Sequence, residues 1–343
     1  HPRHAIDFLR LRAELHMFLG EPELAEPIYR QLIEAKAIAW ARLGLAKTLF
    51  MRERFDEAQG ILENLVDTNK NFVDAYDWLA KTHAAAGLLD KSQAVLADAV
   101  AVSPHAVRRL RKLGEVALET GDSDTAEKVL KQVVAKAKYS EFRDPEDHVK
   151  LVQTLVKRGD AEQAASVIRD LDRSMGGRKN TAACSAISSA MLHEFTGNAD
   201  RLAESLALAV TACKDSVGLS ADVKMELARN CLDHNMEGDA SEVLRDVMRN
   251  APNNSAVTRA MDVLTKSGRG DMALALAKET RQEVVDLVAQ GAVRAKEGDF
   301  RGAVELMTAA VDKLPDNPQV VFNAAVAVLK CLEGFPEPIV LIA

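Results

Sequence analysis

The sequence predicts an all-α protein, one right-handed superhelix over residues 1–343 built from about nine helical hairpins and a terminal helix. Three observations support this prediction. A unit of about 34 residues with two helical stripes recurs along the chain. Glycine separates the two stripes in most units. A small residue then follows at a fixed distance, which is typical of helices that cross closely.

Residues 73–104 show the unit most clearly. One side of its first helix is lined, at i, i+3, i+4 and i+7, by Tyr76, Leu79, Ala80 and His83. Gly87 ends that helix, and the stripe of the second helix consists of Ser92, Leu96 and Ala99. Pro104 closes the unit because proline cannot continue a helix.

The other units are found by the small residue five places after the turn. These markers are Ala25, Ala58, Ser92, Ala126, Ala164, Leu202, Ala240, Ala273 and Ala303. Glycine stands at the turn before seven of them, at Gly20, Gly87, Gly121, Gly159, Gly197, Gly268 and Gly298. A larger side chain at such a crossing would cost about 1 to 3 kcal/mol in strain, so Leu202 marks the least regular unit.

In chain order, the predicted hairpins are 5–36, 39–69, 73–104, 107–139, 145–171, 181–212, 221–249, 254–280 and 284–314, followed by a helix over 318–332. In the first, Pro22 begins the second helix. The second turns at Glu53, where glycine is usual, and the seventh turns at Asn235, which tolerates a left-handed conformation. In the fourth, Asp122 or Asp124 can cap the second helix.

The spacing of the markers changes along the chain. It is 33 or 34 residues up to Ala126 and then 38 residues three times. The extra residues fall at the junctions 139–145, 174–179 and 216–222. Two interpretations stay open: longer second helices or slack loops, and an edge of the array widened for docking.

The repeated unit resembles that of the tetratricopeptide repeat family. The family's repeat has large residues at places 4, 7, 11 and 24, small ones at 8, 20 and 27, glycine at 15 and proline at 32. The unit 73–104 matches this pattern when Val73 is numbered as place 1. The fourth unit matches as well, through Leu110, Leu113, Gly114, Ala117, Gly121, Ala126, Leu130 and Val133. The resemblance covers nearly the whole chain and implies a surface that binds other proteins.

In such arrays places 2, 5, 9 and 12 of each first helix line a concave groove. With the neighbouring basic residues, the implied groove residues are Trp40, Lys47, Asp77, Lys81, Arg108, Arg111, Lys112, Lys150 and Gln153. Arg108, Arg111 and Lys112 share one helical face, and with Lys81 and Lys150 they can bind an acidic peptide. The alternative is a solvated basic face balanced by Glu115 and Glu119. Place 9 is never asparagine, which disfavours a clamp for a terminal carboxylate.

Residues 9–66 also resemble, more narrowly, the repeat region that follows the receiver domain in some bacterial response regulators. A receiver would lie upstream of His1, so none of its residues is carried over. The resulting hypothesis is a cytoplasmic output or adaptor region of a bacterial signalling protein. Two alternatives stay open: a self-associating structural module, and an assembly factor for an envelope or pilus machine.

Composition excludes several other functions. A net charge of -7 and a pI near 5.7 argue against general binding of nucleic acid, which requires a basic face. We find no apolar run of about 18 residues, so membrane insertion is not expected. The four cysteines are widely spaced and are interpreted as reduced thiols. We expect no metal, no cofactor and no catalytic residues, and we expect His16, His83 and His193 to pack within hairpins.

The predicted last helix is apolar on nearly every side. A helix that caps such an array should present a polar outer face. This one carries Val321, Phe322, Val328 and Leu329 among other apolar residues. We therefore expect it to pack on further repeats or on a second copy of the chain.

Overall fold

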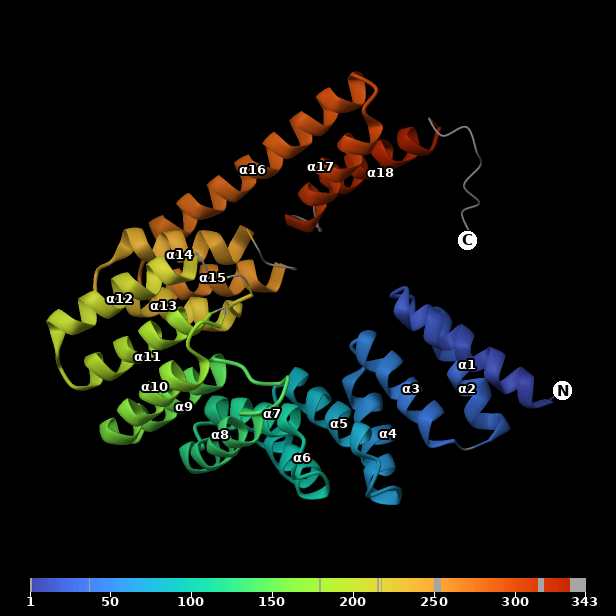
Figure 1. The fold of residues 1–343 in the computed structure, drawn as a ribbon. Helices are drawn as coiled ribbons and strands as arrows, with labels where there is room; N and C mark the ends of the chain where they lie inside the picture. The colour runs from blue at the N-terminus through green and yellow to red at the C-terminus, as the bar shows by residue number, and fades with distance from the viewer. Residues whose placement is uncertain are drawn as a thin grey trace. The chain divides into compact units, whose positions relative to one another are not determined.

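The computed structural model describes residues 2–36, 38–178, 180–214, 216, 218–249, 254–313 and 318–333. Every secondary-structure element within these residues is an α-helix (Figure 1). The chain divides into two compact units, His1–Ser174 and Met175–Ala343. Within each unit consecutive helices pack on one another as hairpins, so the predicted all-α solenoid is confirmed. A single superhelix over the whole chain stays a prediction.

The first unit consists of ten helices, drawn from blue to green in Figure 1. They are α1 (Pro2–Phe18), α2 (Pro22–Ala35), α3 (Ala39–Met51), α4 (Phe55–Thr68), α5 (Val73–Ala85), α6 (Leu89–Val102), α7 (Val107–Thr120), α8 (Ser123–Ala137), α9 (Glu146–Lys157) and α10 (Ala161–Met175). Odd-numbered helices are the first helices of hairpins, and each one after α1 packs on the second helix of the hairpin before it.

The helices of the second unit are α11 (Thr181–Phe195), α12 (Ala199–Lys214), α13 (Ala221–Asp233), α14 (Glu237–Arg249), α15 (Asn254–Lys266), α16 (Gly270–Lys296), α17 (Phe300–Lys313) and α18 (Pro318–Glu333). The predicted boundary between two hairpins, with one ending at residue 280 and the next beginning at 284, is wrong. Helix α16 runs through this boundary for 27 residues. The segment from Thr280 to Glu283 contains neither glycine nor proline, so nothing in it ends a helix.

The turns within hairpins share one backbone conformation. Glu53 and Asn235 both have a φ of 58°, in the left-handed region that glycine adopts at the equivalent turns. The residue after the turn then donates its N–H to a carbonyl five residues back, as from Arg54 to Leu49 over 2.9 Å. At the turn before α8, it is the side chain of Asp122 that accepts the cap bond, from the N–H of Thr125.

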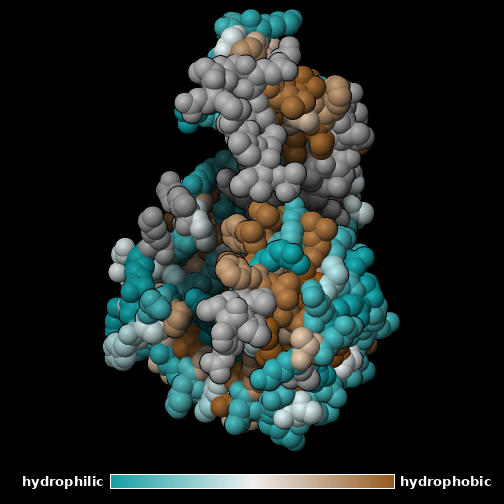
Figure 2. Space-filling model, turned by 90° about the vertical axis from the view of Figure 1, so that its right-hand side faces the viewer, coloured by the Kyte–Doolittle hydropathy of each residue, from teal (hydrophilic) through white to brown (hydrophobic). Residues whose placement is uncertain are grey.

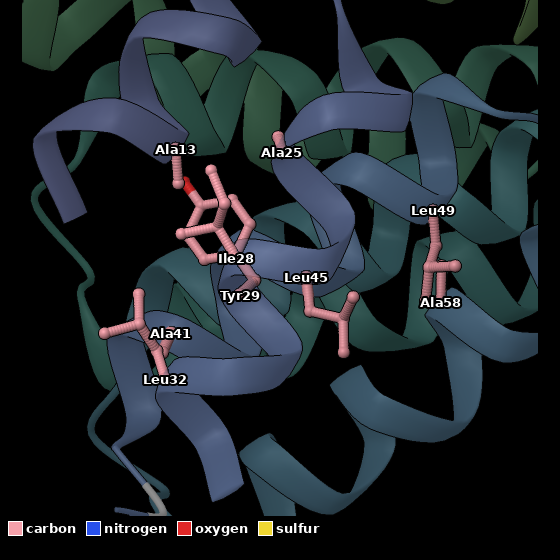
Figure 3. Packing of buried hydrophobic residues seen from close by; sticks show 9 residues of the cluster. All are labelled: Ala13, Ala25, Ile28, Tyr29, Leu32, Ala41, Leu45, Leu49 and Ala58. Atoms are coloured by element: carbon pink, nitrogen blue, oxygen red, sulfur yellow. The ribbon is translucent and has the colours of Figure 1, made fainter. Parts of the chain in front are cut away.

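The core of each hairpin forms where its helices cross. Figure 3 shows the first core cluster, which consists of Ala13, Ala25, Ile28, Tyr29, Leu32, Ala41, Leu45, Leu49 and Ala58. The markers Ala25 and Ala58 are fully buried, which explains why small residues recur there. Among the histidines, His83 is buried, while His16 and His193 are half-buried and contact Glu21 and Ser205. The prediction that they pack within hairpins is confirmed.

We predict that Gly44→Ala lowers the free energy of unfolding by about 1 to 3 kcal/mol. A Cβ at Gly44 would overlap the ring of Tyr29, which is only 4% exposed and belongs to the preceding hairpin. Gly60→Ala, in the middle of α4, is the matched control because its Cβ would meet nothing within 4 Å. It should raise stability by about 0.5 to 1 kcal/mol. Urea unfolding measures both, and equal effects would contradict this packing.

Candidate functional site

A groove of about 880 Å³ lies in the first unit, along the first helices α5 and α7. Its lining residues are Phe50, Asp77, Ala80, Lys81, Ala84, Ala85, Ser92, Leu96, His105, Ala106, Val107, Arg108, Arg109, Lys112 and Phe142. The alanines, Leu96 and Val107 give the groove a largely apolar lining. The remaining lining residues are mainly cations and aromatic rings, a combination suited to a peptide that has both apolar and acidic side chains.

Four of the nine residues expected in the groove line it: Asp77, Lys81, Arg108 and Lys112. Lys81 and Arg108 are exposed, and neither forms an ion pair with any residue that the structure describes. Lys112 is also exposed and lies 3.3 Å from a carboxylate oxygen of Glu115. Lys81 and Arg108 are therefore the cations most available to a ligand.

Aromatic rings hold these two cations in place. The Nζ of Lys81 lies 4.4 Å from the centroid of the Trp78 ring and 4.8 Å from that of Phe50. The guanidinium of Arg108 lies 4.8 Å from the centroid of Phe142. Such cation–π contacts are worth about 0.5 to 1 kcal/mol at exposed sites, and they leave the N–H donors of the cation free.

The sequence analysis did not assign these rings to the site. Phe50 and Trp78 pack edge to face with their centroids 5.5 Å apart, although they come from different hairpins. Phe142 lies in the loop between α8 and α9. Only 4% of the residues are aromatic, so the two rings that line the groove, Phe50 and Phe142, are a notable share, but they come from separate parts of the chain and the repeat pattern does not bring them together.

Asp77 and Arg109 neutralise each other at the wall of the groove. The guanidinium of Arg109 donates to both carboxylate oxygens of Asp77, over 2.7 and 2.6 Å, and to Ser103 Oγ over 2.6 Å. Arg109 belongs to the same basic run as Arg108, Arg111 and Lys112, but it does not lie on the face that those three share and was not among the predicted groove residues. The pair joins neighbouring hairpins, and Asp77 adds little net negative charge to the groove.

Arg111 and Lys150 do not line the groove, because both are engaged in internal ion pairs. Arg111 donates to both carboxylate oxygens of Asp147, over 2.6 and 2.7 Å, and to the carbonyl of Phe142 over 2.7 Å. Lys150 donates to Glu115 over 2.5 Å. Burial raises the pKa of Glu115, but Lys150 and Lys112 outweigh it and leave that pKa below its ordinary value. Glu115 thus balances Lys150 and Lys112, as the alternative interpretation expects, whereas Arg111 is balanced by Asp147 and not by Glu115 or Glu119.

The other three expected residues lie outside the groove. Trp40 packs against the first core cluster, with the guanidinium of Arg10 4.8 Å from its ring centroid. The Nζ of Lys47 lies 5.2 Å from the ring of Trp78. Gln153 is half-buried on α9. The groove is therefore shorter than the family pattern implies.

The described residues contain no cluster of three or more His, Cys, Asp or Glu side chains that could hold a metal ion. Burial raises the pKa of Cys213 to about 11 and that of Cys231 to about 12, so both are poor nucleophiles at neutral pH. None of the helices in the described part of the chain has an apolar stretch long enough to cross a bilayer.

We predict that Arg111→Ala lowers the free energy of unfolding by about 3 to 5 kcal/mol at pH 8, because it leaves a buried carboxylate unpaired. The Asp147 side chain is only 2% exposed. Burial already raises the pKa of Asp147 above its ordinary value, and loss of Arg111 raises it further. The folded variant then binds a proton more readily than the unfolded chain, so the deficit relative to the wild type should shrink at pH 5.

Urea unfolding at pH 8 and pH 5 measures this difference. The control removes both charges, as Arg111→Met with Asp147→Leu, and should recover most of the lost stability. An equal deficit at the two pH values would show that the Asp147 carboxylate is not what makes the single variant unstable.

Two segments of the chain and its fold are similar to known proteins. Residues 78–141 and residues 39–64 each match a family model described as a tetratricopeptide repeat. No curated protein sequence matches the chain. Among solved structures, a tetratricopeptide repeat protein from Parabacteroides merdae ATCC 43184 is 12% identical, with a TM-score of 0.54 over 76% of this chain and 99% of that one.

Two further structures are less similar. YrrB, a TPR protein with an unusual peptide-binding site, is 14% identical, with a TM-score of 0.44 over 54% of this chain and 91% of that one. MamA is 16% identical, with a TM-score of 0.43 over 49% of this chain and 91% of that one. At such low identity the likeness to the Parabacteroides protein shows the fold alone.

Proposed function

We propose that this chain, whose residues 39–64 and 78–141 match models of the tetratricopeptide repeat, is a non-catalytic scaffold that binds another protein through the groove of its first unit. The observation that carries the proposal is the pair of exposed, unneutralised cations, Lys81 and Arg108, beside an apolar groove lining. A groove of this kind recognises a segment of a partner rather than a small polar metabolite.

Charge indicates the chemistry of that segment. The whole chain carries a formal charge of -7, yet the groove is basic because Asp77 is neutralised by Arg109. Lys81 and Arg108 then attract carboxylates, while Ala84, Leu96 and the rings of Phe50 and Phe142 accept an apolar side chain. The proposed ligand is a peptide segment in which acidic residues flank an apolar one.

The role in the cell and the cellular location are a separate part of the proposal. The resemblance of residues 9–66 to repeats of response regulators supports an output or adaptor role in bacterial signalling, and that resemblance is its only support. A cytoplasmic location follows from the same hypothesis. Neither is needed for the groove to bind a peptide.

We predict that Lys81→Glu with Arg108→Glu weakens binding of such peptides about 10²- to 10⁴-fold, because two charge-assisted hydrogen bonds are lost. Each lost hydrogen bond to a charged group is worth about 1.5 to 3 kcal/mol, and 1.4 kcal/mol corresponds to tenfold in affinity. The measurement uses an array of ten-residue synthetic peptides in which the numbers of acidic and apolar residues vary. Fluorescence anisotropy then gives the affinity of the best binders, which should fall with added salt.

The matched control is Lys91→Glu with Lys128→Glu, which changes the net charge by the same amount. Both lysines are exposed and lie on the second helices α6 and α8, outside the groove. This variant should bind like the wild type. If the two double variants bind equally well, or if the array contains no binder, the groove is not the binding site for an acidic peptide.

A further inference from the structure

Apolar side chains are open to solvent at several places, so exposure alone does not identify a binding site. Figure 2 shows hydrophobic areas, in brown, among hydrophilic ones on one face of the molecule. Phe8 and Phe18 on α1 are 71% and 86% exposed. The residues of α18 that the sequence analysis expects to self-associate are between 40% and 62% exposed: Val321, Phe322, Val328 and Leu329. Self-association through α18 therefore stays a prediction.

The groove of the first unit has a feature that these exposed faces lack, because one place in its repeat is unusually small. Place 12 lies three residues before the residue at the turn. In the other hairpins of the first unit it carries a large apolar side chain: Met17, Phe50, Leu118 and Val156. All four are half-buried. In the hairpin of α5 and α6 the same place carries Ala84, which lines the groove.

The large side chains at place 12 fill the junction between successive first helices. Phe50 reaches from α3 to α5, where its ring centroid lies 5.5 Å from that of Trp78. The sulfur of Met17 on α1 accepts a hydrogen bond from the hydroxyl of Thr48 on α3 over 3.0 Å. The side chain of Ala84 ends at its Cβ, so the junction between α5 and α7 has an open place that a side chain fills at the two junctions before it.

The floor of this open place is apolar, and its polar atoms are already paired. Ala80, Leu96 and Val107 line the groove and are only 3%, 2% and 8% exposed. The hydroxyl of Ser92 donates to the carbonyl of Ala80 over 2.8 Å, so neither group needs a hydrogen bond from a ligand. A side chain that enters therefore meets apolar atoms, and the burial of a large apolar side chain there is favourable.

The rim of the open place is basic and favours an aromatic ring. Lys112 stands at place 6 of α7 and lines the groove. Place 6 of α5 is Trp78, the residue that Phe50 contacts one junction earlier. A ligand ring in the open place would thus lie beside Lys112 and gain a cation–π contact, which an aliphatic side chain would not. Lys81 and Arg108 are exposed and can pair with carboxylates on neighbouring residues of the ligand.

We propose that Ala84 sets the specificity of the groove, and that the partner segment it admits carries one aromatic side chain with acidic residues close to it in sequence. The ring of the ligand takes the place that Phe50 fills between α3 and α5. This inference rests on the proposed function, because it names the kind of segment that binds the same groove. Acidic segments without a large apolar side chain leave the place open and bind weakly.

A series of peptides tests the ligand side. The acidic peptide that binds best is compared, by fluorescence anisotropy, in versions with phenylalanine, leucine or alanine at its apolar position. Alanine should weaken binding about 10- to 100-fold relative to phenylalanine, which is what burial of one large apolar side chain is worth. Leucine should bind about two- to fivefold more weakly than phenylalanine, because it lacks the cation–π contact. Equal binding of the phenylalanine and alanine versions would overturn the inference.

Variants that fill the open place test the protein side. Ala84→Phe introduces the residue type found at place 12 one hairpin earlier, and Ala84→Leu the type found one hairpin later. Both should weaken binding of the phenylalanine peptide about 10- to 100-fold and leave binding of the alanine peptide unchanged, because one space cannot be filled twice. The matched control is Ala97→Phe, at an exposed position of α6 outside the groove, which should bind like the wild type. Urea unfolding should show all three variants to be as stable as the wild type.

The charge variant separates this inference from the proposed function. If Ala84→Phe binds the phenylalanine peptide like the wild type while Lys81→Glu with Arg108→Glu does not, the groove binds acidic segments without an aromatic anchor. Only the role of Ala84 is then overturned. If neither variant changes the affinity, the proposed function fails and this inference fails with it.

A shortened chain tests whether the protein supplies the ring itself. In the sequence Phe335 stands between Glu333 and Glu337, which is the order expected of the ligand. Removal of residues 334–343 should leave the affinity for the phenylalanine peptide unchanged. If removal raises that affinity tenfold or more, and a synthetic peptide of residues 330–343 competes for the groove, the chain's own segment is the occupant and the inference of a partner segment is overturned.

Discussion

The close crossing of two helices within each hairpin is the constraint on which the rest of the structure depends. Each crossing brings place 8 of the first helix against place 20 of the second, as the bond from Ser92 to the Ala80 carbonyl shows. At such a point there is room for one substantial side chain at most. Helices this near to one another bury an apolar stripe that neither could bury alone, so stability comes from the stacking of units rather than from one central core.

An ion pair between stacked hairpins fixes part of the groove wall. Arg111 on α7 reaches the buried Asp147 at the start of α9 and also the carbonyl of Phe142 in the intervening loop. The loop that lengthens the repeat at residues 139–145 is thereby fixed, and Phe142 is held where it can stack on Arg108. Arg111, which the sequence analysis expects in the groove, thus positions the groove wall. At this junction the extra residues form a loop that is hydrogen-bonded to α7.

The sequence predicts the helices well because their signals are local: a stripe, a turn residue and a small residue at a fixed spacing. It predicts the boundary near residue 282 poorly, because the repeat register suggests a turn there while the local residues allow a helix to continue. For the groove, the repeat register puts Lys81, Arg108 and Lys112 on the same helix faces of neighbouring units, and all three are among its lining residues. Register cannot show that Arg111 turns toward a carboxylate 36 residues later, or that Phe50 and Phe142 reach a groove formed by other hairpins.

The make-up of the groove implies modest affinity together with selectivity. A groove with two available cations and an open, mostly apolar lining would give modest affinity for any single peptide segment, because little of the ligand is enclosed. Selectivity would then come from the spacing of acidic and apolar side chains along the segment, because Lys81 and Arg108 lie on the successive first helices α5 and α7 beside that lining.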